Sequence, residues 1–275
     1  MILPISNAKE RFKHALSTIS LVSATWYSTS TIAQTPKHSI VQGSQWGAGV
    51  GVISNQKAYK DIARDTLIIP IITYENPYIR WFGTHLDIKL PSYDMSHSQQ
   101  IDFSLSADYD LGSGYDNSEA RDTPILNDMD ERKGVFALGA KLQWVNPWVD
   151  VSAQWMFDVS GDREGNRAKL GFEKKWMFGN HVMLSPRLML TWQDDHFVDY
   201  HYGVRAHEVR SDRPAYRGES SLNIEYGLRS AYMFDKQNAM ILDVGVSQLG
   251  SAIKDSPLVD SSTENTLFFI YMHTF

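Results

Sequence analysis

The sequence predicts an all-β fold, a transmembrane antiparallel β-barrel of the bacterial outer membrane with about twelve strands. Three observations predict it. Apolar and polar residues alternate along most of the chain, aromatic residues make up 12% of it, and no apolar run approaches the roughly 18 residues that a membrane-spanning helix needs. An alternating strand offers one face to lipid and the other to a polar lumen.

Composition excludes several other classes of protein. The chain has 275 residues, 43% of them hydrophobic, which is enough to fold, so a wholly disordered chain is excluded. Cysteine is absent, which removes disulfide scaffolds, thiolate zinc sites and cysteine nucleophiles. The formal net charge of −6 argues against nucleic acid as a partner.

The first 33 residues follow the pattern of an export signal. Lys9, Arg11 and Lys13 form a basic start, residues 15–26 are uncharged and moderately apolar, and small residues precede a cut after Ala33. We therefore expect residues 1–33 to be a signal peptide and residues 34–275 to form a single barrel domain. The alternative is a frayed soluble N-terminus.

Alternation is clearest near residue 101, where Ile101 and Phe103 share one face and Asp102 and Ser104 share the other. Many such segments are about twice the five or six residues usual in a soluble β-sandwich, the competing fold. Segments 78–82 and 84–90 could also be one bulged strand. The predicted strands are 46–53, 67–75, 78–82, 84–90, 101–111, 135–145, 148–158, 168–178, 182–193, 221–234, 239–249 and 266–275.

Loop lengths sort as they do in outer-membrane barrels, which have long external loops and short periplasmic turns. With both termini in the periplasm, the outward loops are 54–66, Gly83, 112–132, 159–167, 194–220 and 250–265. The inward turns are 76–77, 91–100, 146–147, 179–181 and 235–238. Only Gly83 and 91–100 depart from the rule.

The last strand ends on an aromatic residue, Phe275, and Leu267, Phe269 and Tyr271 alternate ahead of it. This pattern is similar to the signal read by the outer-membrane assembly machinery, so we expect Phe275 to act in assembly. Other aromatic residues fall near strand ends, as in the interfacial girdles of membrane barrels.

Several short motifs recur in a fixed order along the chain, at 46–52, 70–75, 158–161, 184–186, 202–204, 213–216 and 255–259. Together they resemble the MipA/OmpV family of outer-membrane proteins. The sequence alone assigns no role to the residues of the later motifs. These residues are Asp158, Ser160, Gly161, Tyr202, Gly203, Pro214, Tyr216, Asp255, Ser256 and Pro257.

The resemblance implies a non-catalytic barrel of the outer membrane, in contact with lipid and lipopolysaccharide. One branch of the family is named for interaction with a murein-hydrolysing transglycosylase, as a scaffold between hydrolase and synthase. Other members are described as porin-like proteins or adhesins, so a channel for small solutes and a surface adhesin stay open as alternatives.

Two groups of polar residues are candidates for binding or chemistry. Loop 194–220 holds acidic and histidine side chains that could bind a cation, but a solvated acidic loop is the simpler interpretation, and we predict no catalytic residue, metal or cofactor. The lumen face carries mixed charges that form either a plug of ion pairs or a narrow aqueous path. These lumen residues are Asp102, Asp108, Lys141, Gln143, Asp150, Glu173, Arg187, Glu225, Arg229 and Asp243.

A periplasmic partner needs periplasmic surface, and the inward turns are short. Residues 91–100 are the only long inward loop in the predicted topology, with Tyr93 and Met95 as apolar anchors. We therefore predict Tyr93 and Met95 as a candidate periplasmic contact for a murein hydrolase. The alternatives are an ordinary exposed loop without a partner and a contact through segment 34–45, the other stretch of periplasmic surface. The motif loops at 158–161 and 202–216 fall at the opposite, external end.

Overall fold

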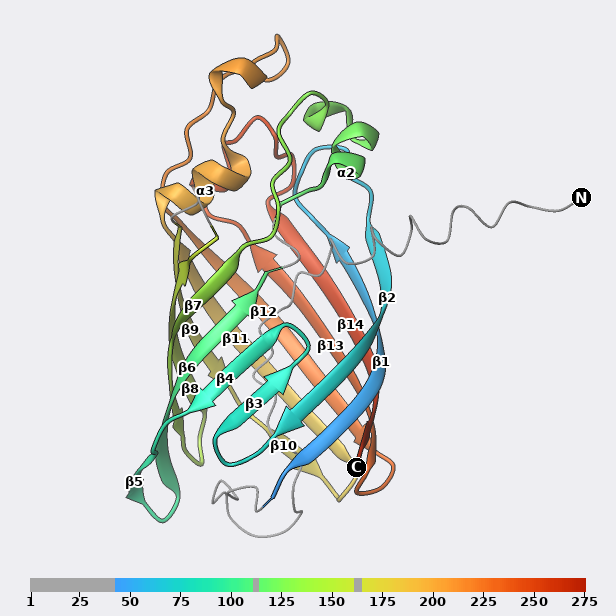
Figure 1. Ribbon diagram of the computed structural model, residues 1–275, viewed down its shortest axis with the longest axis vertical. Coiled ribbons are helices and arrows are strands. Elements are labelled where there is room, and N and C mark those ends of the chain that lie inside the picture. Colours follow the sequence, from blue (N-terminus) through green and yellow to red (C-terminus); the bar gives the residue numbers. More distant parts are fainter. Residues whose placement is uncertain (1–42, 111–113, 161–164) are drawn as a thin grey trace, which may run out of the picture.

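The computed structural model describes residues 43–110, 114–160 and 165–275, and it is a β-barrel with loops packed over one end (Figure 1). The predicted signal peptide and Gly161 lie outside the described residues. In the described part of the chain, no helix combines the length and apolar character needed to cross a membrane.

The sheet closes on itself because β11 pairs with both β9 and β12, and β1 pairs with β14. Every ladder is antiparallel, and the strands pair in chain order except that β4 pairs with β6, β9 pairs with β11, and β1 pairs with β14. The strands are β1 (Gln45–Gln56), β2 (Asp65–Glu75), β3 (Ile79–Phe82), β4 (His85–Lys89), β5 (Tyr93–Ser96), β6 (Gln99–Tyr109), β7 (Phe136–Val145), β8 (Asp150–Asp158), β9 (Asn166–Glu173), β10 (Trp176–Phe178), β11 (Val182–Gln193), β12 (Ser221–Met233), β13 (Asn238–Gln248) and β14 (Thr263–Thr274).

The barrel wall has twelve strands, counted without β5 and with β9 and β10 as one, which confirms the predicted number. β5 pairs only with β6 and lies off the closed path. β9 and β10 are one barrel strand, since Glu173 faces Arg187 and Trp176 faces Leu184 in the same register. The interruption lies opposite Pro186, which has no N–H to give to the ladder.

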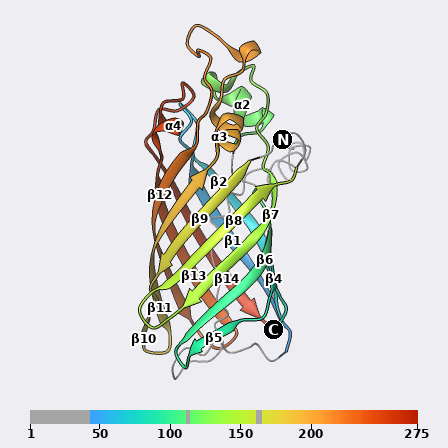
Figure 2. The ribbon, with the colours of Figure 1, turned by 90° about the vertical axis from the view of Figure 1, so that its left-hand side faces the viewer.

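The two ends of the barrel differ as the loop lengths predicted (Figure 2). One end carries the short turns, the β5 hairpin and the C-terminus, and the other carries the long loops. Those long loops contain short helices. The sequence did not predict them, because helices this short show no helical period over a long window. The helices are α2 (Asn117–Asp122), η1 (Pro124–Leu126), α3 (Asp195–Tyr202), η2 (Ala206–Glu208) and α4 (Ser251–Lys254).

Two predicted loops differ from the structure. Residues 91–100 are largely a β-hairpin, because β5 pairs with the start of β6. Gly83, predicted as an outward loop, is a tight turn with φ of 54° between β3 and β4. These are two separate strands rather than one bulged strand, and both are much shorter than β2, so their turn stops well below the outer end of β2 (Figure 1).

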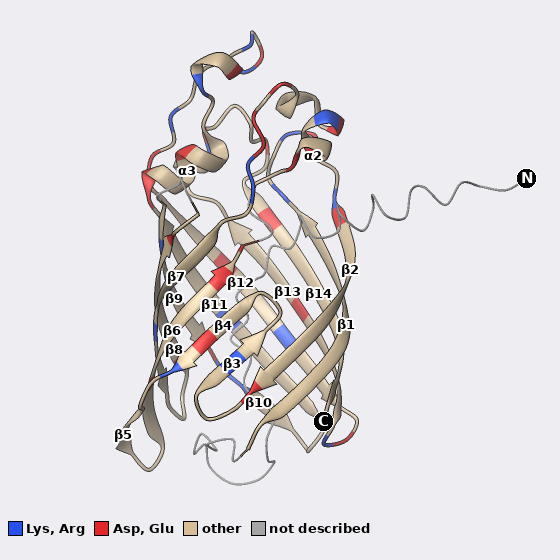
Figure 3. Cartoon of the chain, in the orientation of Figure 1, with Lys and Arg blue, Asp and Glu red and all other residues tan. Residues whose placement is uncertain are grey.

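The two faces of the wall follow the alternation in the sequence. Ile68 and Tyr226 are 72% and 56% exposed and face the lipid side, as do most large apolar side chains of the strands. Charged side chains such as Lys141, Arg187 and Asp243 are buried in the lumen. Figure 3 shows charged positions on the strands as well as on the outer loops.

Candidate functional site: the capped outer mouth, the lumen and the inner hairpin

The outer mouth of the barrel is covered by four loops, 57–64, 114–135, 194–220 and 249–262, which we call the cap. The cap has a hydrophobic core of its own, to which every one of the four loops contributes. A fully buried Leu or Ile contributes about 1.5–3 kcal/mol relative to exposure. The core residues are Ala58, Tyr59, Ile62, Tyr115, Ala120, Ile125, Leu126, Met129, Val198, Tyr202, Val204, Leu249, Ile253 and Leu258.

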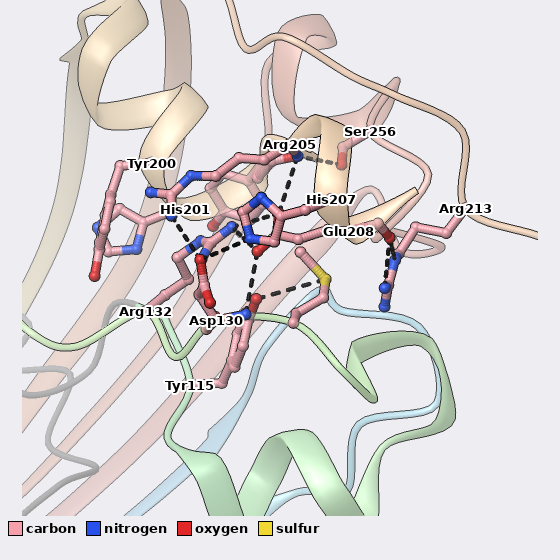
Figure 4. Close-up of polar contacts among 12 residues, drawn as sticks. Tyr115, Asp130, Arg132, Tyr200, His201, Arg205, His207, Glu208, Arg213 and Ser256 are labelled. Atoms are coloured by element: carbon pink, nitrogen blue, oxygen red, sulfur yellow. Dashed lines mark hydrogen bonds and ion pairs between the residues drawn. The ribbon is translucent and has the colours of Figure 1, made fainter. Parts of the chain in front are cut away.

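Two buried arginines tie the cap loops together (Figure 4). Arg132 donates to both carboxylate oxygens of Glu208, at 2.8 and 2.9 Å, and both residues are 1% exposed. Burial by itself lowers the pKa of Arg132, but Tyr115 and Glu208 leave that pKa raised. Arg213 donates to the carbonyl oxygens of Glu208 and Ile125, at 2.6 Å in each case. The burial of these arginines could not be predicted from the sequence, because charged residues in loops usually face water.

Most of the family-motif residues converge in this cap, where they hold the loops in place. Ser256 is buried and donates to the carbonyl of Tyr202 at 2.6 Å, and the ring of Tyr202 stacks on Tyr59 at 5.4 Å. The Tyr216 hydroxyl donates to the carbonyl of Ala252 at 2.7 Å.

The remaining motif residues of the cap lie beside these contacts. Gly203 ends α3, and a Cβ there would stand 2.3 Å from the carbonyl oxygen of Asp199. Asp255 ends α4, where its N–H donates to the carbonyl of Ser251. Pro214 is exposed and Pro257 is half-buried.

The two motif residues outside the cap lie at the end of β8. Asp158 is buried and accepts a hydrogen bond from Arg167 at 3.2 Å, and Arg167 also reaches Asp110 at 2.7 Å. The hydroxyl of Ser160 accepts from the N–H of Phe136 at 3.1 Å. Both therefore fix the start of the external β8–β9 loop.

Loop 194–220 is not the solvated acidic loop that the sequence suggested. Glu208 and His201 are buried in the cap, while Asp195 and His196 stay exposed. Asp194 caps α3 by accepting from the N–H of Phe197 at 2.9 Å. The interpretation as a solvated loop was wrong because it rested on the charged residues alone, whereas apolar residues of the same loops form the cap core.

Two sets of carboxylate and histidine atoms lie within 4.8 Å of one another, Asp194 with Asp195 and His196, and Asp130 with His207 and Glu208. In the second set, the hydrogen bond from His207 lowers the pKa of the exposed Asp130. Glu208 already accepts from Arg132 with both oxygens. The hydrogen bonds of these side chains thus serve helix capping and loop contacts.

Ion pairs join nearby strands on the lumen face, as the mixed charges on that face predicted. Arg187 donates to Asp243 at 2.7 Å and to Glu225 at 2.9 Å, and Arg229 donates to the same Asp243 at 2.8 Å. A cavity beside Arg187 and Arg229 has room for about one water molecule.

A second network of polar side chains lies on the wall formed by β4, β6 and β7. Asp87 contacts His85 at 3.0 Å, Lys141 at 3.8 Å and the hydroxyl of Ser106 at 2.6 Å. Both networks place ionic and polar side chains on the lumen face of the wall, where most of them bond to one another.

The remaining lumen positions lie nearer the inner end. Asp102 accepts from Gln100 at 2.6 Å, and Asp150 pairs with Lys175 at 3.0 Å. Gln143 is buried.

At the inner end, the predicted contact residues lie on the exposed β5 hairpin. All four β5 residues are exposed, with Tyr93 at 64% and Met95 at 52%. Phe275 is 71% exposed, and its N–H donates to the carbonyl of Trp46 at 2.8 Å. The terminal aromatic side chain is therefore accessible while its backbone closes the β14–β1 seam.

Comparison with known proteins identifies the family. The family model described as MltA-interacting protein MipA matches residues 47–275. The Escherichia coli (strain K12) protein named as outer membrane protein YiaT is 25% identical over 224 residues, which cover 81% of this chain and 88% of that protein. The MltA-interacting protein of the same strain is 22% identical over 222 residues, covering 78% of this chain and 84% of the relative.

Solved outer-membrane barrels align with most of the chain. A loop L8 deletion mutant of OmpT, an outer membrane protein of Vibrio cholerae, aligns with 85% of this chain and 99% of its own, at a TM-score of 0.36 and 7% identity. The predicted family, barrel fold and outer-membrane location are confirmed. The chain belongs to the MltA-interacting protein MipA family of outer-membrane proteins.

Proposed function

We propose that this outer-membrane barrel is a non-catalytic interaction protein that holds a murein hydrolase at its periplasmic end. The observation that carries the proposal is the β5 hairpin, which places exposed Tyr93 and Met95 beside the inner rim of the barrel. An exposed aromatic residue next to a methionine is typical of a contact site. The name of the relative, MltA-interacting protein, supports a hydrolase as the partner.

The closed outer mouth supports this proposal over the channel alternative. The cap core covers the mouth, and ion pairs such as Arg187–Asp243 line the lumen face of the wall. Both features favour a narrow or closed path over a wide aqueous channel. The motif residues act in the cap as structural contacts, which supports a barrel without catalytic machinery.

The test is capture of purified MltA by the folded barrel in detergent. Replacing all of 91–100 would remove residues of β6 that pair with β7, so point substitutions are sharper. We expect Tyr93→Ser combined with Met95→Ser to abolish capture. Tyr78→Ser is the matched control, because Tyr78 is 72% exposed on another inner turn. Unchanged capture by the double variant would show the contact site to be wrong, and failure of the unaltered barrel to capture MltA would remove the hydrolase proposal itself.

A further inference from the structure

Among the described residues, the wall of the barrel is incomplete on one side of β2. β2 pairs with β3 only at Thr73, Tyr74 and Glu75, and the N–H of Gly83 then donates to the carbonyl of Ile72. Above that point, from Asp65 to Ile71, β2 has β1 on one side and no strand of the described residues on the other. The end of β6 lies across the gap, since the N–H of Tyr109 donates to the carbonyl of Thr84 at the same turn.

This unpaired edge lies in the lipid-facing part of the wall. Ile68 and Ile72, which flank it, are 72% and 49% exposed, as expected of side chains that contact acyl chains. The backbone groups of alternate residues point to the same side, so those of Ile68 and Pro70 point the same way as the carbonyl of Ile72, into the gap.

Pro70 is suited to this position, because it has no N–H that would need a partner. A strand edge left open to hydrocarbon is otherwise costly, at several kcal/mol for each unsatisfied group. Pro70 thus lies where a longer β3 would pair with β2, and its missing N–H lowers the cost of leaving this edge unpaired.

The inner face next to the gap is apolar on one flank and polar on the other. Ile69, Ile71 and Phe82 are buried on the lumen side and belong to one hydrophobic cluster. On the other flank, His85 and Asp108 face each other in the β4–β6 ladder. Lumen walls of such barrels are usually polar, so this apolar cluster distinguishes the side of the lumen next to the gap and is chemically suited to a hydrocarbon chain.

The polar flank carries two atoms that lack a hydrogen-bond partner within the described part of the chain. They are the Nδ1 atom of His85 and the Oδ1 atom of Asp108, 3.9 Å apart, and Asp108 is only 8% exposed. Buried polar atoms are nearly always paired, so an orphan pair is suited to a polar group that arrives from outside the chain. A carboxylate oxygen accepts hydrogen bonds, which calls for a donor on the incoming group.

We propose that the gap between β2 and β6 is a side opening through which a single-chain amphiphile enters the lumen from the bilayer. Its hydrocarbon chain would lie along Ile69, Ile71 and Phe82, and its hydrogen-bond-donating head would reach Asp108 and His85. The opening is bounded below by the Gly83–Thr84 turn. At the outer end of the barrel, Lys57 joins two cap loops through Glu119 at 2.7 Å. This inference is independent of the periplasmic contact proposed above.

Single cysteines test the opening, because the natural chain has none. Barrels carrying one cysteine are placed in phospholipid vesicles and treated with N-dodecylmaleimide. Ile71→Cys should be labelled at least an order of magnitude faster than Ala231→Cys, which is also buried in the lumen but lies on β12, a strand paired on both sides. Ile72→Cys faces lipid and serves as the positive control.

Equal labelling of the Ile71→Cys and Ala231→Cys variants, or none of Ile71→Cys in a barrel that shows heat-modifiable migration, would overturn the side opening. Ile69→Cys replaces Ile71→Cys if that variant fails to fold.

The head group is tested by protection of the same cysteine. Dodecylamine and dodecanol both carry a hydrogen-bond donor and should slow the labelling of Ile71→Cys, and the difference between them identifies the preferred head. Dodecyltrimethylammonium has the same chain and no donor, so it should protect far less. Asp108→Ala should remove the advantage of the two donors. Equal protection by all three amphiphiles would overturn the role of Asp108.

Discussion

Arg132 and Glu208 join two loops that are 76 positions apart in the sequence, through two hydrogen bonds of 2.8 and 2.9 Å. Both side chains are almost fully buried, so neither can turn to water if the other is removed. A buried pair adds little to stability compared with apolar residues of the same shape, but loss of one partner costs about 3–5 kcal/mol. The cap is therefore stable only when loops 114–135 and 194–220 pack together and this pair is formed.

Glu208→Ala should loosen the cap while the barrel stays folded, because the strands keep their ladders. We expect trypsin to cleave the outer loops of this variant in intact vesicles much faster than those of the unaltered protein. Asp130→Asn is the control, since Asp130 pairs with Arg205 in an exposed position, where a pair contributes about 0–1 kcal/mol. Equal resistance of the Glu208→Ala variant would show that the pair does not hold the cap.

Asp243→Ala should destabilise the barrel itself. Asp243 accepts from both Arg187 and Arg229, so its removal leaves two buried guanidinium groups short of a partner, at a cost of about 3–5 kcal/mol. Urea unfolding in detergent, followed by tryptophan fluorescence, measures the change. The control is Glu219→Ala, at an exposed position of loop 194–220, where a change within about 0.5 kcal/mol is expected.

The barrel was predictable because its physical causes are local. Alternation places lipid-facing and lumen-facing residues on opposite faces, and all twelve wall strands lie where that alternation predicted them, to within a few residues. The lumen charges followed from the same pattern, and so did the inner position of Tyr93 and Met95. The family was predicted from its resemblance to the ordered motifs along the chain.

The cap was not predictable, because its contacts join residues far apart in the chain. Ser256 meets Tyr202, and Arg132 meets Glu208, only after four loops have packed together. The signal that could have been used is the presence of Ile125, Leu126 and Leu258 in segments assigned to solvent. The short β3–β4 hairpin was visible as a one-residue loop at Gly83, but its consequence for the wall of β2 required the strand register.

Alkaline pH should open the cap before it unfolds the barrel. Burial raises the pKa of the Tyr59, Tyr115 and Tyr202 hydroxyls in the closed cap, and in an opened cap these groups titrate near 10. The opened form therefore loses protons first, so the stabilisation is fully present below about pH 10 and is lost as the pH rises beyond it.

Tyrosinate absorbance at 295 nm measures this effect in detergent. The unaltered protein should show a late group of tyrosines that ionise together with cap opening. A variant with Phe at the three positions should lack this group. A late group of the same size in both proteins would contradict the assignment.

Deletion of Phe275 should slow assembly more than it lowers stability. The side chain is 71% exposed and meets the ring of His273 edge-on at 4.9 Å, while its N–H donates one hydrogen bond to the carbonyl of Trp46. We expect slower appearance of the heat-modifiable form in assembly reactions with the outer-membrane machinery, and a nearly unchanged unfolding midpoint. A Phe275→Tyr variant, which keeps a terminal aromatic residue, is the control that should assemble at the normal rate.

Conductance across a planar lipid bilayer tests the central claim most directly, that the barrel is closed by its cap and its lumen ion pairs. The unaltered protein, inserted at neutral pH, should give no steady current steps. A variant with Glu208→Ala and Asp243→Ala together should give brief openings as a positive control for insertion. Steady, long-lived steps from the unaltered protein would contradict the account and favour a channel for small solutes.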